Sequence, residues 1–145
     1  MEIKKTHIGS YGIIIKNDKI ALIKKARGGY KGKLDLPGGG IEYMERPNET
    51  LKREIMEEVG VDVDDYSLLD VTSVNIKWEM EKDLWEDLHH IGILYKVSIS
   101  DLNLKGDADG LDSDGTSWYS ISNLKSEEMS PFAKYGIEML GYKLK

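Results

Sequence analysis

Residues 34–61 read LDLPGGGIEYMERPNETLKREIMEEVGV, and this stretch decides the fold. It opens with a short alternation of apolar residues that breaks into the glycine turn Gly38–Gly40. Pro47 fits the first turn of a helix, where its missing N–H costs nothing. Gly60 is a typical C-terminal stop, so the sequence predicts a helix from Pro47 to about Val59.

Three glutamates share one side of this predicted helix. Glu54, Glu57 and Glu58 stand at positions i, i+3 and i+4, where their like charges repel one another. In an arbitrary Glu-rich helix such a face is usually solvated. A divalent cation turns the repulsion into attraction, because Mg²⁺ or Mn²⁺ takes carboxylate oxygens as ligands. The neighbouring face can pack on a sheet, since it carries apolar residues four positions apart: Leu51, Ile55 and Val59.

The stretch from Gly39 to Val61 resembles the motif of the Nudix hydrolases. That motif is Gly, five residues, Glu, seven residues, then Arg-Glu-apolar-any-Glu-Glu-any-Gly-apolar. The chain matches it at Gly39, Glu45, Arg53, Glu54, Ile55, Glu57, Glu58, Gly60 and Val61. A chance match of that many constrained positions is rarer than roughly one in a billion per start point. The flanking segments also resemble the family, so the likeness covers nearly the whole chain.

The resemblance implies an α/β (α+β) fold, the Nudix-type α/β/α sandwich with a mixed central sheet, as a single domain over residues 1–145. It implies Mg²⁺-dependent (or Mn²⁺-dependent) hydrolysis of a diphosphate bond in a nucleoside diphosphate linked to a group X, by metal-activated water. The marks of several subfamilies are absent. Elimination therefore leaves a nucleoside triphosphate, canonical or oxidised, as the first expectation.

Carried over position by position, the resemblance also implies roles for individual residues. The carboxylates of Glu54, Glu57 and Glu58 and the carbonyl of Gly39 are expected to bind metal. Glu57 or Glu54 is the expected general base. A third candidate is an acid in a later loop, Asp112 or Asp114, where an ordinary polar loop is the simpler interpretation.

The other motif residues, Glu45, Arg53 and Gly60, are expected to be structural. Arg53 should pair with Glu45 or with loop groups, pointing away from the carboxylate side. Two positions depart from what relatives often carry: Met44 replaces a glycine, and Arg46 replaces a Ser or Thr cap. Loss of a cap costs on the order of 1 kcal/mol unless another group replaces it.

Candidate substrate-binding residues lie outside the motif. Arg27, with Lys31 and Lys33, could meet phosphates from the loop before the glycine turn, although a solvated basic loop explains them equally well. His89 and His90 are consecutive in a predicted strand and must face opposite sides, so one of them could enter a pocket. A tryptophan in a small domain is more often core than ligand platform. The chain has three tryptophans that could stack on a base, Trp78, Trp85 and Trp118. Of these, Trp85 is the better stacking candidate because it lies among charged residues.

The remaining chain predicts strands around these sites. Tyr11–Ile15 and Lys19–Ile23 should form a hairpin around Asn17-Asp18. Residues 67–78 and 89–99 should be strands, separated by a charged loop over residues 79–87 that carries Trp85. A polar stretch over residues 105–115 should precede a short strand near Trp118. Ser130-Pro131 should open a last helix with an apolar stripe at Tyr135, Ile137, Met139 and Leu140.

Composition limits the classes of function. The net charge is −6, from 26 acidic and 20 basic residues, which disfavours binding to long nucleic acid. No apolar run is long enough for a membrane span, and the absence of cysteine is compatible with a reducing cytoplasm. The expected partner is a nucleotide-type small molecule, and a homodimer is common among relatives. The alternatives are a Nudix-like ligand sensor without turnover and a protein-binding module.

Overall fold

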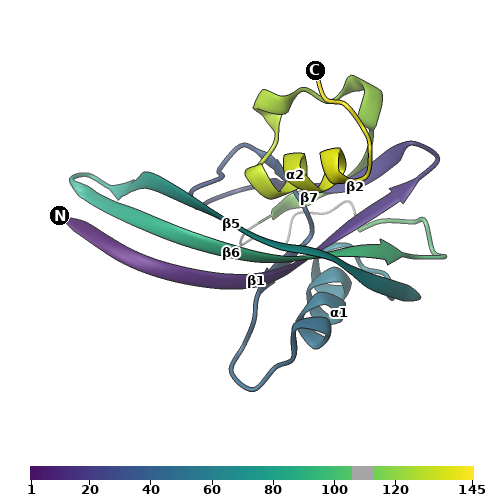
Figure 1. Ribbon diagram of the computed structural model, residues 1–145, viewed down its shortest axis with the longest axis horizontal. Helices are drawn as coiled ribbons and strands as arrows, with labels where there is room; N and C mark the ends of the chain where they lie inside the picture. Colours follow the sequence, from purple (N-terminus) through teal and green to yellow (C-terminus); the bar gives the residue numbers. More distant parts are fainter. Residues whose placement is uncertain (106–112) are drawn as a thin grey trace.

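The computed structural model describes residues 1–105 and 113–145. A curled mixed sheet runs through the molecule, with one helix on each side of it (Figure 1). The elements in chain order are β1 (Glu2–Lys16), β2 (Lys19–Lys25), β3 (Leu34–Asp35), β4 (Gly38–Gly40), α1 (Pro47–Glu58), β5 (Asp65–Glu81), β6 (Leu84–Ser98), β7 (Ser113–Ser120) and α2 (Pro131–Met139), with short 3-10 turns at Ile121–Asn123 and Ser126–Glu128. The predicted fold class is confirmed. In the described ranges, no helix has the length and apolar character needed to cross a membrane.

Strand β1 organises the sheet because it pairs on both sides. It turns back into β2 through Asn17 and Asp18, whose positive φ angles of 52° and 61° suit a tight type I′ hairpin. On its other side it pairs in parallel with β6, and β6 pairs antiparallel with β5. The order is β3-β2-β1-β6-β5, with β4 also paired to β1 and β7 to β2. The predicted hairpin is confirmed.

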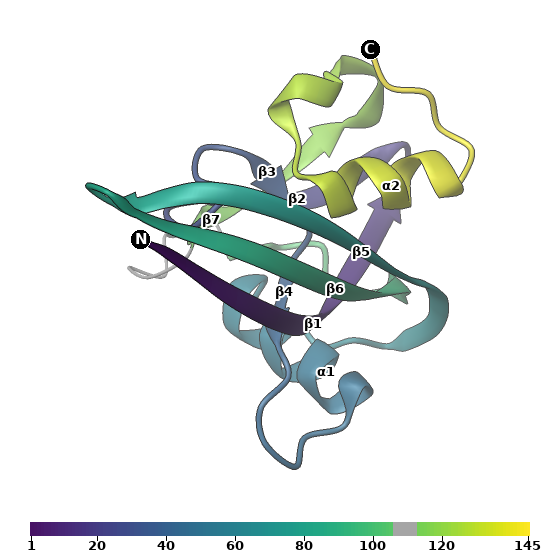
Figure 2. The same cartoon turned by 60° about the vertical axis from the view of Figure 1, so that its left-hand side comes forward.

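The sheet divides the apolar core in two, because successive side chains of a strand face opposite sides. Ile13 packs with Phe132 of α2, whereas Ile14 packs with Leu51 and Ile55 of α1. Each of these side chains is at most 1% exposed. Figure 2 shows the two helices on opposite sides of the sheet. Packing of the Leu51–Ile55 face against the sheet turns the glutamate side of α1 toward the glycine strand.

Helix α1 has the predicted bounds to within one residue. Val59 is its C-cap residue, and Gly60 follows with a φ of 80°. The guanidinium of Arg46 cannot accept a hydrogen bond and leaves the N-cap side-chain role empty. The carboxylate of Glu49 accepts a hydrogen bond from Arg46 N at 2.9 Å, which supplies half of a capping box.

Strands β5 and β6 form a long hairpin where the sequence predicts a charged loop. The loop over residues 79–87 is wrong, because β5 continues to Glu81 and β6 begins at Leu84. Asp83, with a φ of 62°, lies in the tight turn between them. The apolar alternation of β5 continues through Ile76, Trp78 and Met80, but charged residues are dense over residues 79–87. In β6 they occupy both faces, at Glu86 and Asp87, so the start of that strand is hidden in the sequence. We call residues 2–8, 74–81 and 84–91 the wing; it extends beyond both helices (Figure 1).

Helix α2 buries a different face from the predicted one. Its buried residues are Phe132, Ala133, Gly136 and Ile137. Tyr135 and Met139 are 38% and 44% exposed, so the predicted stripe is wrong at these two positions. The physical reason is a close approach at Gly136, where a Cβ atom would lie 2.4 Å from Cδ1 of Ile13. The helix therefore rotates its glycine face, rather than its aromatic face, onto the sheet.

Candidate functional site

A cleft of about 1350 Å³ opens among the wing, the loop after β2, strand β4 and helix α1. Its lining combines opposite charges with aromatic groups. The acidic groups at α1 are Glu54, Glu57 and Glu58, next to the glycines of β4. The basic groups are Lys5, Lys25, Arg27, Lys31 and Lys105, and the aromatic groups include Tyr11, Tyr30, Trp78 and His90.

The glycines of β4 are required by close contacts on both sides. Gly39 pairs with Ser10 of β1 in the sheet register. A Cβ atom at Gly38 would lie 2.1 Å from the backbone oxygen of Ser10, and the φ of Gly38 is 147°. A Cβ atom at Gly39 would lie 2.5 Å from Oε1 of Glu54. The bare backbone of β4 thus lets the Glu54 carboxylate approach it directly.

Glu58 is the most deeply buried of the three glutamates. Its side chain is 6% exposed, and Oε1 accepts a hydrogen bond from Gly38 N at 2.8 Å. Burial raises the pKa of Glu58 to about 8, and the nearby charge of Glu54 acts in the same direction, while the Gly38 hydrogen bond opposes them. A positively charged partner would therefore be strongly favourable at the Glu58 carboxylate.

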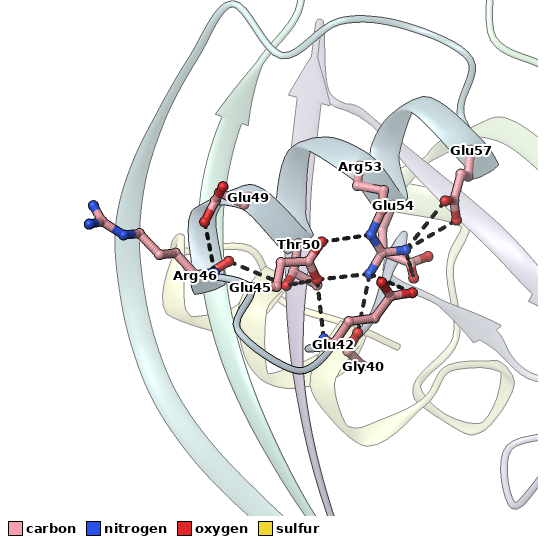
Figure 3. A network of polar contacts seen from close by, with 9 residues as sticks. All are labelled: Gly40, Glu42, Glu45, Arg46, Glu49, Thr50, Arg53, Glu54 and Glu57. Atoms are coloured by element: carbon pink, nitrogen blue, oxygen red, sulfur yellow. Dashed lines mark hydrogen bonds and ion pairs between the residues drawn. The ribbon is translucent and has the colours of Figure 1, made fainter.

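Arg53 is the centre of a network that joins α1 to the loop after β4 (Figure 3). Its Nε and Nη2 donate to the two carboxylate oxygens of Glu45 at 2.8 and 3.0 Å, so the predicted pairing is present. This pairing and the Thr50 hydroxyl lower the pKa of Glu45 to about 2. Nη1 also donates to Glu54 at 3.0 Å and to Glu57 at 3.3 Å. The prediction that Arg53 points away from the carboxylate side is therefore wrong, because its planar fork reaches three carboxylates at once.

The donor set at this end of the cleft suits a hard divalent cation. The carboxylates of Glu54, Glu57 and Glu58 and the carbonyl of Gly39 are all oxygen donors, as Mg²⁺ and Mn²⁺ prefer. Across the described part of the chain, no three His, Asp or Glu side chains are already gathered around one point. Arg53 bonds Glu54 and Glu57, and Gly38 bonds Glu58. An ion held by these carboxylates would therefore replace contacts that Arg53 makes with Glu54 and Glu57.

His90 is held between two tyrosines in the cleft. The Tyr11 hydroxyl lies 2.6 Å from Nε2, and the Tyr30 hydroxyl lies 3.0 Å from Nδ1. Burial lowers the pKa of His90 to about 3, with His7 and Lys25 acting in the same direction. The imidazole is therefore neutral at physiological pH. It donates to one hydroxyl and accepts from the other.

The structure separates the four predicted substrate-binding residues into two pairs. Arg27 and His90 line the cleft, whereas Trp85 and His89 do not. The reason is strand alternation: Trp85 and His89 share the face of β6 opposite to His90 and are both exposed.

The other residues singled out in the sequence lie in different places. Lys31 lines the cleft, but Lys33 instead donates from Nζ to the backbone oxygen of Glu127. Trp118 is half-buried and donates from Nε1 to the backbone oxygen of Leu102 at 3.1 Å. Asp112 and the side chain of Asp114 lie outside the described residues.

Sequence reasoning missed several cleft residues: His7, Lys25, Tyr30, Asp35 and Glu86. Trp78 was a stacking candidate ranked below Trp85, and it is Trp78 that lines the cleft. Asp35 is fully buried, and its carboxylate accepts hydrogen bonds from the Ser130 hydroxyl and from Leu36 N. For His7, the information that was lacking is the parallel register of β1 on β6, which places His7 opposite His90. That register joins segments more than eighty residues apart, and no local pattern specifies it.

Comparison with known proteins gives one family model and several curated relatives. A NUDIX domain model matches residues 6–140. An 8-oxo-dGTP diphosphatase from Proteus vulgaris is 34% identical over 74 residues, which are 50% of this chain and 66% of that protein. An ADP-ribose pyrophosphatase from Methanocaldococcus jannaschii is 47% identical over 62 residues, 43% of this chain and 37% of the relative. The chain thus aligns with less than two thirds of the length of these relatives.

A solved structure extends the likeness to the whole fold. The crystal structure of a MutT NUDIX hydrolase from Burkholderia pseudomallei has a TM-score of 0.75 and covers 94% of this chain and 98% of that chain, at 21% identity. The family-model match runs from β1 past the motif helix and through α2. The chain therefore belongs to the NUDIX domain family.

Proposed function

We propose that this chain hydrolyses a diphosphate bond in a nucleoside diphosphate linked to a group X, with Mg²⁺ or Mn²⁺ as its cofactor. A nucleoside triphosphate, canonical or oxidised, is the first substrate class. The observation that carries the proposal is the junction of the complete Gly39–Val61 motif with a 1350 Å³ cleft, where three carboxylates meet a bare glycine strand. The diphosphatase and pyrophosphatase names of two relatives support the same bond type.

The residues of the chain divide the work as follows. Glu54, Glu57, Glu58 and the Gly39 carbonyl would hold the cation. When bound, such a cation neutralises the diphosphate and lowers the pKa of a water molecule. Glu57 or Glu54 takes the proton as the water oxygen bonds to phosphorus and the bridging P–O bond breaks. The nucleoside monophosphate and the remainder leave as separate products.

The basic residues of the cleft suit the rest of a polyphosphate. Lys5, Lys25, Arg27 and Lys31 bring positive charge to the cleft without being on α1. A chain with a net charge of −6 would otherwise repel an anionic substrate. Arg53 and Glu45 brace the loop after β4 against α1 and so position the Gly39 carbonyl.

The test is an assay of hydrolysis on a panel of nucleotides with Mg²⁺ or Mn²⁺, in which released phosphate or pyrophosphate is measured. Glu57→Gln should lower turnover by at least about 10²-fold, because it removes a ligand or the base. Glu49→Gln is the matched control, because it makes the same change on the same helix but keeps an acceptor for Arg46 N. Turnover without metal, or full activity in Glu57→Gln, would contradict the mechanism. Nucleotide binding without turnover would favour a ligand sensor.

A further inference from the structure

We infer that Trp78, held by Glu86, is the platform on which the base of the nucleotide stacks. This inference rests on the proposed function and adds to it the part of the cleft that recognises the nucleoside. The cleft volume of about 1350 Å³ exceeds the few hundred to 1,000 Å³ that small-molecule pockets usually have. The volume therefore leaves room for a nucleoside beyond the diphosphate and its metal.

The indole of Trp78 is fixed before any ligand arrives. Trp78 and Glu86 are directly opposite each other on β5 and β6. Trp78 Nε1 donates to Oε1 of Glu86 at 2.9 Å, and the Glu86 side chain is only 7% exposed. A ring whose polar edge is already satisfied loses little rotamer freedom when a base stacks on it.

The residues around Trp78 form a surface that suits a planar heteroaromatic ligand. Met80 and Leu88 line the same cleft and supply apolar surface. The loop after β2 lies directly against this region, because a Cβ atom at Gly29 would be 3.1 Å from Cδ1 of Trp78 and 2.5 Å from Cδ1 of Ile76. Aromatic, thioether and aliphatic groups favour a π-face over a hydrated sugar or phosphate.

The rest of the lining orients the nucleotide. Trp78 lies in the wing, near the β5–β6 turn, whereas Glu57 lies on α1; Figure 1 shows the end of the wing well away from that helix. The cleft that contains both residues also contains Lys25 and Arg27. A ligand that carries an aromatic base at one end and a polyphosphate at the other matches these groups of the cleft.

The experiment measures binding rather than turnover, in the full chain carrying Glu57→Gln. Two probes are compared, GTP and inorganic tripolyphosphate, which share the triphosphate but differ in the nucleoside. Trp78→Leu should weaken GTP binding at least about 10-fold and leave tripolyphosphate binding within about 2-fold. Trp85→Leu is the matched control, because Trp85 is on the same hairpin and outside the cleft. It should change neither affinity.

A second measurement leaves Trp78 intact. In a Trp85→Phe, Trp118→Phe background, the fluorescence of Trp78 should be quenched by GTP and not by tripolyphosphate. GTP affinity within about 2-fold of the parent in Trp78→Leu, an equal loss for both probes, or no quenching by GTP would overturn the inference. If GTP quenches Trp78 but the wild-type protein hydrolyses no nucleotide, the base platform stands and the hydrolase proposal fails.

Discussion

His90 illustrates, at the scale of single residues, how burial sets the chemistry of the cleft. Its ordinary pKa of 6.5 falls to about 3 in the folded chain. Between these values the unfolded chain binds a proton that the folded chain does not. The contribution of His90 to the free energy of unfolding is therefore complete above about pH 6.5 and is lost as the pH falls toward 3. We expect a loss on the order of 3 kcal/mol between pH 7 and pH 4.

Denaturant titrations from pH 7 to pH 4 check this expectation. His90→Gln can still bond both tyrosine hydroxyls, so it should fold and show a flatter dependence of stability on pH. His89→Gln, on the exposed face of the same strand, should retain the wild-type dependence. An unchanged profile in His90→Gln would show that another group carries the effect.

Met44 carries backbone strain that the family motif does not demand. Its φ is 68° and its side chain is 83% exposed, so no packing compensates for the left-handed conformation. Met44→Gly should therefore raise the free energy of unfolding by about 0.5–1 kcal/mol, because relief of strain exceeds the added chain entropy. Met44→Ala keeps the Cβ atom and should give no such gain. Equal effects of the two substitutions in urea unfolding would contradict this explanation.

Single residues also show how far the sequence could predict the site. The motif positions placed Glu54, Glu57 and Glu58 on one side of a helix, because helical spacing is local information. Asp35 and Tyr30 were not predicted, since a loop and a two-residue strand bring them to the cleft. The contacts of Arg53 with Glu54 and Glu57 were missed because a long side chain can curl back along its own helix.

At the scale of elements, β4 combines two glycines with different requirements. A side chain at Gly38 would meet the rigid backbone of Ser10, whereas one at Gly39 would meet the movable end of Glu54. Gly38→Ala should therefore destabilise the protein by at least about 2 kcal/mol. Gly39→Ala should keep most of the stability and lose turnover, because it displaces Glu54, a proposed metal ligand. Thermal unfolding and nucleotide hydrolysis, measured side by side, would refute this division if both variants behaved alike.

Helices and strands also differ in how well they can be predicted from the sequence. The β1–β2 hairpin and α1 were predictable, because Asn17-Asp18, Pro47 and Gly60 are strong local signals. The β5–β6 turn was not, because charged residues are dense over residues 79–87 and the start of β6 has Glu86 and Asp87 on opposite faces, which hides its alternation. This error placed Trp85 in a loop and ranked it above Trp78, the tryptophan that lines the cleft.

At the scale of the whole molecule, the sheet separates the motif helix from the C-terminal helix. Gly136→Ala should overpack the α2 side against Ile13 and lower the free energy of unfolding by about 1–2 kcal/mol. The α1 side should be unaffected, so turnover well below the melting temperature should stay within about 2-fold. A large loss of turnover in a folded Gly136→Ala variant would mean that the two sides are coupled, for example through the contact of Phe132 with His90.

At the same scale, the proposed cation would complete the site formed by α1 and β4. Arg53 bonds the carboxylates of Glu45, Glu54 and Glu57, and Glu58 stays buried beside them with a raised pKa. If the chain binds the proposed cation, mass action stabilises the folded state by about 2.7 kcal/mol at a hundredfold excess over Kd. Thermal unfolding with and without Mn²⁺ should therefore show a higher melting temperature with metal, which Glu58→Gln reduces.

Calorimetric titration of the full chain with Mg²⁺ and Mn²⁺, in the presence and absence of a non-hydrolysable nucleotide, tests the central claim most directly. The account predicts saturable binding of the ion, weakened at least about 10-fold in Glu57→Gln and unchanged in Glu49→Gln. Absence of binding by both ions under both conditions would contradict the claim that these carboxylates form a metal site.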